Sequence, residues 1–321
     1  MTLYGAIDIG SNSTRLLIAK LGEGRIVPVE TDLCNSRLAE GLEDTGALGK
    51  DAQARTLAAV AEFWERCREV GVEGIRVGAT SAVRGAANGK EFLQSLKKAT
   101  GLEAEVFSGE MEARLSFYGV TWALPMVAAG PSLIIDIGGG STELLRGVGR
   151  EVRASVSLPL GAVGLMESHP FLRNGPLGPT QLEQMEERVR AVLAGSGLED
   201  LGGGKGEAPP LAVGVGGTVT TLTAIYLRLE RYGANLVHGV VLPRRHLRRI
   251  LLRLAAMDPA QRKEVRGLPA DRADTIIAGT IILLALLAKL DLPELISSEG
   301  DILLGMLVDL GAKMGWGPGI S

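Results

Sequence analysis

Residues 7–17 read IDIGSNSTRLL, and residues 135–145 read IDIGGGSTELL. The second stretch follows the first at an offset of 128, and eight of the eleven positions are identical. Each copy contains an apolar run, an Asp, a glycine-rich turn and hydroxyl side chains. A chance match of two unrelated turns explains so many identities poorly, so we infer that a strand–turn–strand unit is duplicated. The duplication predicts two related domains.

The rest of the chain alternates predicted strands with predicted helices. Apolar runs bounded by turn residues predict strands at 3–9, 15–21, 25–31, 75–79, 104–107, 132–137 and 142–147. Apolar residues at helical spacing predict helices at 51–70, 89–100, from 109, 180–194, 218–230, 244–256, 272–289 and 301–313. This alternation is typical of an α/β protein with covered sheets. We place domain I at 1–120, completed by a C-terminal helix at 300–315, and domain II at 121–299.

Composition limits the classes of function. The 321 residues include 34 basic and 37 acidic side chains, and the net charge is −3. This balance argues against a general nucleic-acid binder, which needs concentrated positive charge. The start has no basic signal region, and the longest apolar run, 276–288, is too short to span a bilayer. The two cysteines, Cys34 and Cys67, do not form a disulfide framework. We expect a cytoplasmic protein with no membrane segment.

The repeated motif is suited to binding a phosphate together with a cation. A glycine-rich turn lets backbone N–H groups converge on an anion, and hydroxyl groups add donors. Asp8 and Asp136 would repel phosphate directly, so we expect them to hold a divalent cation or its water. The alternative is that each Asp only caps its turn. The predicted phosphate-binding residues are Gly10, Ser11, Asn12, Ser13, Gly138, Gly139, Gly140, Ser141 and Thr142.

A third glycine cluster, VGVGGTVT at 213–220, again follows an apolar strand and opens a helix. Helix N-termini present free N–H groups that favour anions. Alone the cluster is a weak indication, but beside the other two it predicts further phosphate contacts from Gly216, Gly217 and Thr218.

The order DIGSNS, IDIGGGSTE and GVGGT resembles the actin, chaperone-ATPase and sugar-kinase superfamily. Its phosphatase branch, the exopolyphosphatase / guanosine pentaphosphate phosphohydrolase family, is the finer resemblance. The segments that carry it are ATSAVRGAANG (79–89), FSGEMEARLSFYGV (107–120), IDIGGGSTEL (135–144) and RADTIIAG (272–279). The similarity extends from Ile7 to about Gly305.

The resemblance implies two duplicated actin-like (ribonuclease H-like) domains with the active site in the interdomain cleft. It implies hydrolysis of the terminal phosphoanhydride of inorganic polyphosphate, with release of orthophosphate. Guanosine pentaphosphate is the alternative substrate. It also implies magnesium or manganese as the cofactor, a homodimer, and catalytic carboxylates at Glu112 and Glu143.

Glu112 is the candidate base or water-positioning residue. Phosphoryl transfer to water has a loose transition state, so positioning and charge stabilisation dominate catalysis. Spacing alone favours a solvated carboxylate near a helix N-terminus, and only the resemblance favours a catalytic role. Glu110 is the nearby competitor, but it points to a different helix face, and we choose Glu112.

Charge differs between the two repeats at one position. Glu143 occupies the place that Arg15 holds in the first copy. We expect Arg15 to contact phosphate, and Glu143 to hold metal or water together with Asp8 and Asp136. The alternative for Glu143 is a carboxylate on a strand surface.

Arginines elsewhere offer further phosphate contacts. Arg84 lies in a loop between a strand and a helix and can bind phosphate in a bidentate way. The stretch 244–253 carries five arginines that could guide polyphosphate, although the solvated face of an amphipathic helix is the favoured interpretation. The three histidines do not have the spacing of metal ligands, and we interpret His238 as a structural residue.

Two features depart from the family pattern. Longer relatives carry a C-terminal helical domain with a His-Asp signature, which is not present here, and this puts processivity in doubt. The chain reads GDILLG at 300–305, where relatives tend to have an Arg-containing turn.

The competing hypotheses are an ATP-dependent kinase of the same superfamily and a non-catalytic polyphosphate-binding protein.

Overall fold

The computed structural model of the chain describes residues 1–201 and 210–315. Internal contacts divide the chain into two units. Unit 1 consists of Met1–Trp122 together with the C-terminal segment that begins at Gly300, and unit 2 is Ala123–Glu299. Unit 2 is therefore continuous in sequence, whereas unit 1 is completed by residues from the far end of the chain.

Unit 1 contains a five-stranded sheet in the order β3-β2-β1-β4-β5. Strands β1, β2 and β3 are antiparallel neighbours, and β4 and β5 continue the sheet in parallel. The strands are β1 (Thr2–Ile9), β2 (Thr14–Gly22), β3 (Arg25–Cys34), β4 (Gly74–Ala79) and β5 (Glu105–Val106). The helices are α1 (Leu42–Thr45), α2 (Lys50–Glu69), α3 (Ser81–Gly85), α4 (Gly89–Thr100), α5 (Gly109–Ala123) and α13 (Ile302–Lys313).

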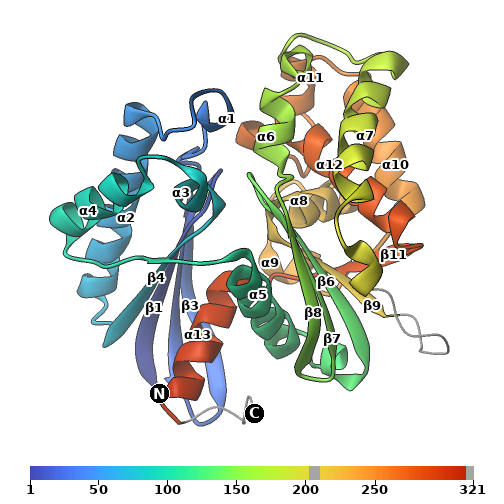
Figure 1. Cartoon of the computed structure of the whole chain (residues 1–321). Helices are drawn as coiled ribbons and strands as arrows, with labels where there is room; N and C mark the ends of the chain where they lie inside the picture. The colour runs from blue at the N-terminus through green and yellow to red at the C-terminus, as the bar shows by residue number, and fades with distance from the viewer. Residues whose placement is uncertain (202–209, 316–321) are drawn as a thin grey trace. The chain divides into compact units, whose positions relative to one another are not determined.

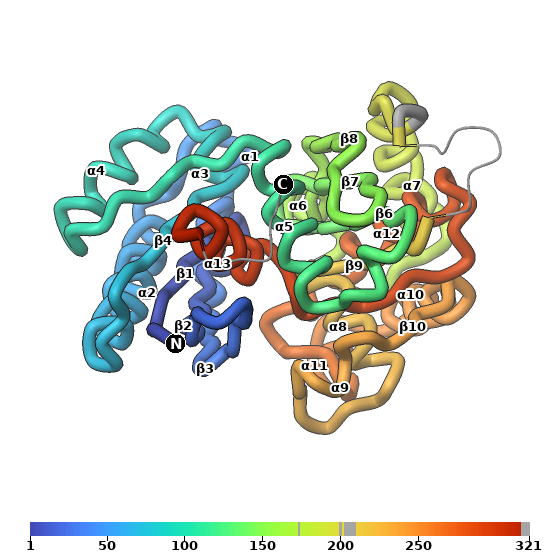
Figure 2. The backbone as a smooth tube through the Cα atoms, turned by 90° about the horizontal axis from the view of Figure 1, so that it is seen from below, coloured from blue at the N-terminus to red at the C-terminus, as the bar shows by residue number. Residues whose placement is uncertain are grey.

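Successive side chains of β1 lie on opposite faces of the sheet, so they pack into two different hydrophobic cores. Ile7 and Ile9 pack with α2 and α4 on one face, in a cluster that includes Phe63 and Phe92. Tyr4 and the other residues of the opposite face pack against α5 and α13. Helix α13 lies beside β1, so the first strand and the last helix of the chain pack together in unit 1 (Figures 1 and 2).

Unit 2 contains a six-stranded sheet in the order β10-β11-β9-β6-β7-β8. Its strands are β6 (Pro131–Ile137), β7 (Thr142–Val148), β8 (Glu151–Leu158), β9 (Leu211–Val215), β10 (Val241–Pro243) and β11 (Glu294–Ser297). Its α-helices are α6 (Ala162–Glu167), α7 (Pro179–Ala194), α8 (Gly216–Leu227), α9 (Ala234–Val237), α10 (Arg244–Ala255), α11 (Pro259–Lys263) and α12 (Ile276–Lys289). The 3-10 helices are η1 (Pro125–Ala129), η2 (Pro170–Arg173), η3 (Leu198–Leu201) and η4 (Ala270–Arg272).

The two sheets repeat one topology. Strands β8-β7-β6-β9-β11 of unit 2 follow the same order as β3-β2-β1-β4-β5 of unit 1, and β10 is an addition at the edge. The register is also repeated, because Asp8 is paired with Arg15 and Asp136 with Glu143 across antiparallel strands. The predicted α/β class with two duplicated domains is confirmed.

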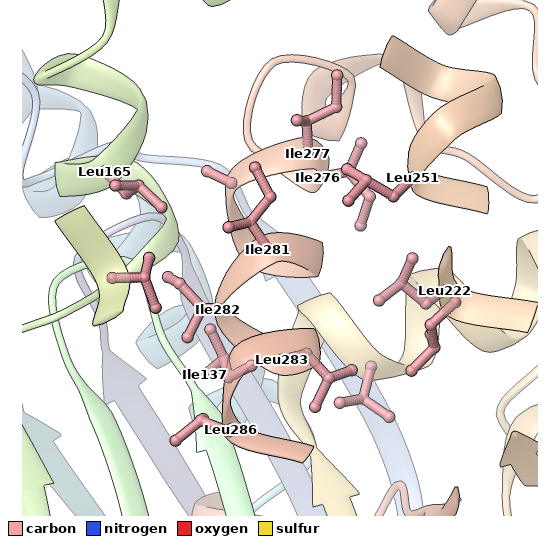
Figure 3. Packing of buried hydrophobic residues seen from close by; sticks show 14 of the residues in the cluster. Ile137, Leu165, Leu222, Leu251, Ile276, Ile277, Ile281, Ile282, Leu283 and Leu286 are labelled. Atoms are coloured by element: carbon pink, nitrogen blue, oxygen red, sulfur yellow. The ribbon is translucent and has the colours of Figure 1, made fainter. Parts of the chain in front are cut away.

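Helix α12 is the centre of the unit 2 core. Figure 3 shows its Ile281 and Ile282 among side chains of β6, α6, α8 and α10. The apolar run at 276–288 is thus a buried core helix. None of the helices in the described ranges is both long enough and apolar enough to cross a bilayer. The helix predicted at 272–289 was wrong at its start, because residues 270–272 form the 3-10 helix η4 and α12 begins at Ile276.

Candidate functional site

The first glycine-rich turn lies between β1 and β2 and is closed by its own backbone. The N–H of Gly10 donates to the carbonyl of Ser13 at 3.0 Å. The hydroxyls of Ser11 and Ser81 are 2.9 Å apart, so the start of α3 is attached to this turn. Asn12 and Ser13 are partly exposed at the tip. The turn is therefore rigid, and its tip is accessible to a ligand.

Arg15 bridges two carboxylates in unit 1. Its Nη2 and Nε donate to Asp8 Oδ2 at 2.7 and 3.1 Å, and its Nη1 donates to Asp301. Asp301 also caps α13 by accepting from the N–H of Leu303 at 3.0 Å. The predicted role of Arg15 in phosphate binding stays a prediction. Its guanidinium is engaged with the residues that tie the first turn to the C-terminal helix.

Asp8 is buried, and among the described residues only one of its two carboxylate oxygens has a hydrogen-bond partner. Burial raises the pKa of its carboxyl above the ordinary value, although the charge of Arg15 acts in the opposite direction. The Oδ1 atom has no hydrogen-bond partner among the described residues. A buried carboxylate oxygen without a partner is costly, so a cation or its water would be stabilised at this atom. This geometry fits the prediction that Asp8 serves a metal.

Glu112 is buried near the start of α5, whereas Glu110 is exposed. Only 7% of the surface of Glu112 is accessible. Its carboxylate accepts from Nη1 of Arg84, and the same nitrogen donates to the carbonyl of Phe107 at 2.5 Å. Arg84 lies one helical turn beyond Ser81, which contacts the first glycine-rich turn. Glu112, Arg84 and the turn thus form one connected set in unit 1.

Close helix packing holds this set against the C-terminal helix. A Cβ atom at Gly119 of α5 would lie 2.0 Å from the carbonyl oxygen of Asp301. A Cβ atom at Gly305 of α13 would lie 1.8 Å from the carbonyl oxygen of Leu115. Both distances are far below van der Waals contact, so the two helices can cross only where they carry glycine. The helix that carries Glu112 is therefore fixed relative to Asp301.

The second glycine-rich turn, in unit 2, repeats the closure of the first. The N–H of Gly138 donates to the carbonyl of Ser141 at 2.9 Å. The hydroxyl of Thr142 donates to the carbonyl of Leu160 at 2.5 Å. Gly139 and Gly140 are partly exposed at the tip. Both predicted phosphate turns thus have the same construction.

Two carboxylates lie side by side at the base of the second turn. Asp136 and Glu143 are directly paired across β6 and β7, where side chains are about 5 Å apart. Glu143 is buried and accepts from the hydroxyl of Ser157 at 3.0 Å. Like charges in this position are destabilising unless a cation or a proton offsets them. In unit 1 the same position holds an Asp–Arg pair, so the two units differ in the charge of this pair.

The carboxylates described above suit magnesium, which needs few protein ligands, better than a metal ion whose ligands all come from the protein. Within the described ranges, no group of three or more His, Cys, Asp or Glu residues is placed to hold an ion. Magnesium is usually held by one or two carboxylates, together with water and substrate phosphates. The pair Asp136 and Glu143 matches that requirement.

The third glycine cluster opens α8 and is covered by an arginine that the sequence did not single out. A Cβ atom at Gly217 would lie 1.5 Å from Nη1 of Arg272, so the guanidinium rests directly on this glycine. The hydroxyl of Thr218 donates to the carbonyl of Ile137 at 3.4 Å. Thr80 makes the equivalent contact with Ile9 in unit 1, at 3.3 Å. Arg272 brings positive charge to the helix N-terminus at which phosphate binding is predicted.

The basic stretch of α10 has the geometry of an amphipathic helix. Leu247, Leu251 and Leu254 are buried. Arg248 forms an ion pair with Glu186 at 2.8 Å, and Arg244 donates to the carbonyl of Leu287 at 3.1 Å. These two arginines thus have structural partners. The guidance of polyphosphate by this stretch stays a prediction.

Sequence reasoning missed two residues that complete these sets, Asp301 and Arg272. Asp301 precedes an apolar run, a pattern that predicts an N-cap but does not reveal its contact with Arg15. Arg272 lies within the segment RADTIIAG, which was recognised but was given no role.

Comparison with known proteins decides the family. The profile described as the Ppx/GppA phosphatase family matches residues 17–313 of the chain. The chain belongs to the Ppx/GppA phosphatase family. A solved family member from Aquifex aeolicus superimposes with a TM-score of 0.80 at 31% identity and covers 98% of both chains. An exopolyphosphatase from Cytophaga hutchinsonii gives a TM-score of 0.85 at 26% identity, over 98% of both chains.

Two curated relatives in the Ppx/GppA family differ in name and in length. Exopolyphosphatase 2 of Mycobacterium tuberculosis is 33% identical over 329 residues, which cover 97% of this chain and 99% of the relative. The guanosine-5'-triphosphate,3'-diphosphate pyrophosphatase of Vibrio vulnificus is 31% identical over 312 residues. That match covers 97% of this chain but only 60% of the Vibrio protein.

Proposed function

We propose that the chain hydrolyses the terminal phosphoanhydride of inorganic polyphosphate and releases orthophosphate. The support from similarity is the match to a mycobacterial protein named exopolyphosphatase over 99% of that protein's length. The support from structure is that each unit carries one glycine-rich turn of the same construction. These turns provide the backbone and hydroxyl donors that a phosphate chain requires.

The observation that carries the proposal is the buried carboxylate of Glu112. It lies in the same connected set as the first turn, and Arg84 fixes its orientation. A fixed carboxylate in a mostly dry position can orient a water molecule and accept its proton as the new P–O bond forms. Arg84 would stabilise negative charge on the phosphate oxygens.

The predicted site residues of unit 2 would stabilise the polyphosphate that leaves when the terminal phosphate is released. Arg272 and the N–H groups at the start of α8 place positive charge in unit 2, and the hydroxyl of Thr218 is attached to the end of β6. Asp136 and Glu143 would hold magnesium or manganese in unit 2, and in unit 1 the Oδ1 atom of Asp8 could accept from a metal-bound water. When bound, the ion neutralises charge on the phosphate oxygens and so favours P–O bond cleavage.

Guanosine pentaphosphate is the second candidate substrate. The relative named guanosine-5'-triphosphate,3'-diphosphate pyrophosphatase matches 97% of this chain. Both substrates end in the same phosphoanhydride, so the residues described here serve either one. A direct comparison of turnover is therefore needed to choose between them.

The test is phosphate release from short polyphosphate, long polyphosphate, guanosine pentaphosphate and ATP at fixed magnesium. Glu112→Gln keeps the size of the side chain but removes the charge, and it should lower kcat by about 100- to 10,000-fold. Glu110→Gln is the matched control, because Glu110 is exposed two residues away, and it should stay near wild-type activity. Equal activity of wild type and Glu112→Gln would refute the assigned role. Release from ATP alone would favour the kinase hypothesis.

A further inference from the structure

His238 lies in unit 2 and has no part in the proposed reaction. It follows the short helix α9, which lies beside α8 (Figure 2). Its Nε2 is 3.2 Å from the carbonyl oxygen of Ala123. Its Nδ1 accepts a hydrogen bond from the backbone N–H of Glu299 at 3.1 Å. The imidazole therefore joins two backbone positions that are far apart in sequence.

These two positions are the boundaries of unit 2. The chain passes between the units twice, once after Trp122 and once after Glu299. Ala123 is the first residue after one passage, and Glu299 is the last residue before the other. One side chain thus holds both connections at the points where they join unit 2. Connections of this kind are where a two-domain protein takes up changes of backbone conformation.

Each connection leads directly to a residue of the proposed site. Ala123 is the last residue of α5, the helix that carries Glu112, and its carbonyl is one of the terminal groups that a helix cannot satisfy internally. Glu299 is separated by one residue from Asp301, which binds Arg15 and caps α13. His238 therefore contacts the end of one site-bearing segment and the start of another.

The hydrogen bonds require one form of the imidazole. The Glu299 N–H can only donate, so Nδ1 must present its lone pair. The Ala123 carbonyl can only accept, so Nε2 must carry the proton. The neutral tautomer protonated at Nε2 satisfies both partners. Loss of either contact would free one connection from the other.

The side chain of Glu299 is also fixed. It accepts a hydrogen bond from the hydroxyl of Tyr232, in the loop between α8 and α9. The backbone and the side chain of Glu299 are thus attached to two different residues of unit 2. This double attachment makes the second connection a defined structure rather than a loose linker.

We propose that His238 is a positioning residue that couples the two connections, because its side chain holds the backbone at Ala123 and the backbone at Glu299 together. Its effect on catalysis rests on the proposed function, whereas its effect on the connections does not. Loss of the coupling should lower the fraction of bound substrate that is correctly aligned. The expected result is a lower kcat with little change in KM.

The experiment compares wild type with His238→Ala, His238→Asn and His238→Gln. Asn retains an acceptor near the position of Nδ1, and Gln retains an amide N–H near the position of Nε2. His238→Ala should lower kcat about ten- to hundredfold, as expected for the loss of two hydrogen bonds, and each amide variant should restore part of it. His169→Ala is the matched control, because His169 bonds only to Ser168 and Leu165 in its own segment, and it should leave kcat unchanged.

Hydrogen exchange provides a readout that does not depend on activity. In His238→Ala the amide of Glu299 should exchange at least about ten times faster, while the amides of β6 and β9 keep their wild-type rates. Unchanged exchange at Glu299 would overturn the coupling, whatever the activity. Faster exchange with an unchanged kcat in an active enzyme would overturn the positioning role. If even the wild type released no phosphate, the proposed function would fail, and the exchange data would decide the coupling separately.

Discussion

Gly217 offers a sharp test of the phosphate site in unit 2, because one methyl group there should displace Arg272 without disturbing the fold. In Gly217→Ala the new Cβ would lie 1.5 Å from Nη1 of Arg272, and ordinary contact requires at least 3.4 Å. The guanidinium must therefore move by about 2 Å, which is enough to break a hydrogen bond of 2.7–3.2 Å. The end of an arginine side chain can move this far at low cost.

The expected loss follows from that displacement. A hydrogen bond to a charged group contributes about 1.5–3 kcal/mol, which corresponds to roughly 10- to 150-fold in kcat/KM. Stability should not fall, because Gly217 is the second residue of α8 and alanine favours a helix by about 0.5–1 kcal/mol over glycine. Gly195→Ala is the matched control, since a Cβ there meets nothing within 4 Å.

The assay is phosphate release together with thermal unfolding, for Gly217→Ala, Arg272→Ala and the double variant. If the glycine serves to admit the guanidinium, the double variant should be no less active than Arg272→Ala alone. Wild-type activity in Gly217→Ala, or losses that multiply in the double variant, would refute the reasoning. A large fall in the unfolding temperature would show that the methyl group disturbs more than Arg272.

Three further predictions concern metal binding and stability. Magnesium should raise the unfolding temperature of wild type but not of Glu143→Gln, because the variant lacks one of the two carboxylates proposed to hold the ion; equal magnesium shifts would argue against this site. Arg262 is fully buried and donates to the carbonyls of Leu254, Leu172 and Gly175 at 3.0 Å each. Arg262→Met should therefore lower the free energy of unfolding, measured in urea, by about 3–5 kcal/mol. The control Arg266→Met, at an exposed residue, should lower it by less than about 0.5 kcal/mol. Burial raises the pKa of the Cys67 thiol from 9.0 to about 11, so the folded state keeps a proton that the unfolded state loses, and the free energy of unfolding should fall as pH rises from 9 to 11. Cys67→Ala should remove that part of the slope, and identical slopes in the two proteins would contradict the assignment.

The duplication was the most predictable feature of the fold. Two matching motifs predict matching strand pairs, and the register of Asp8 with Arg15 and of Asp136 with Glu143 follows from them. The choice of Glu112 over Glu110 also rests on sequence, and the structure confirms that Glu112 is the buried carboxylate of the two. Periodicity was sufficient for the strands and helices that are long or repeated, whereas the choice of Glu112 rested on the family resemblance.

Contacts between distant segments could not be predicted in this way. Arg15 binds Asp301, which lies 286 positions away, and no local spacing encodes that pair. Short elements such as β10 and η4 have only three residues each, too few for apolar spacing to reveal them. The position of Arg272 on Gly217 likewise depends on how η4 is placed by the core around α12.

The completion of unit 1 by α13 has a consequence for synthesis of the chain on the ribosome. Residues of unit 2 leave the ribosome before α13 does, and they form a continuous segment that contains its own core. One face of β1 and β2, including Tyr4 and Leu17, must wait for Ile302 and Met306 before it is covered. Unit 1 is thus the last to mature, and a nascent chain stopped before Gly300 would carry an exposed apolar surface that chaperones and proteases recognise.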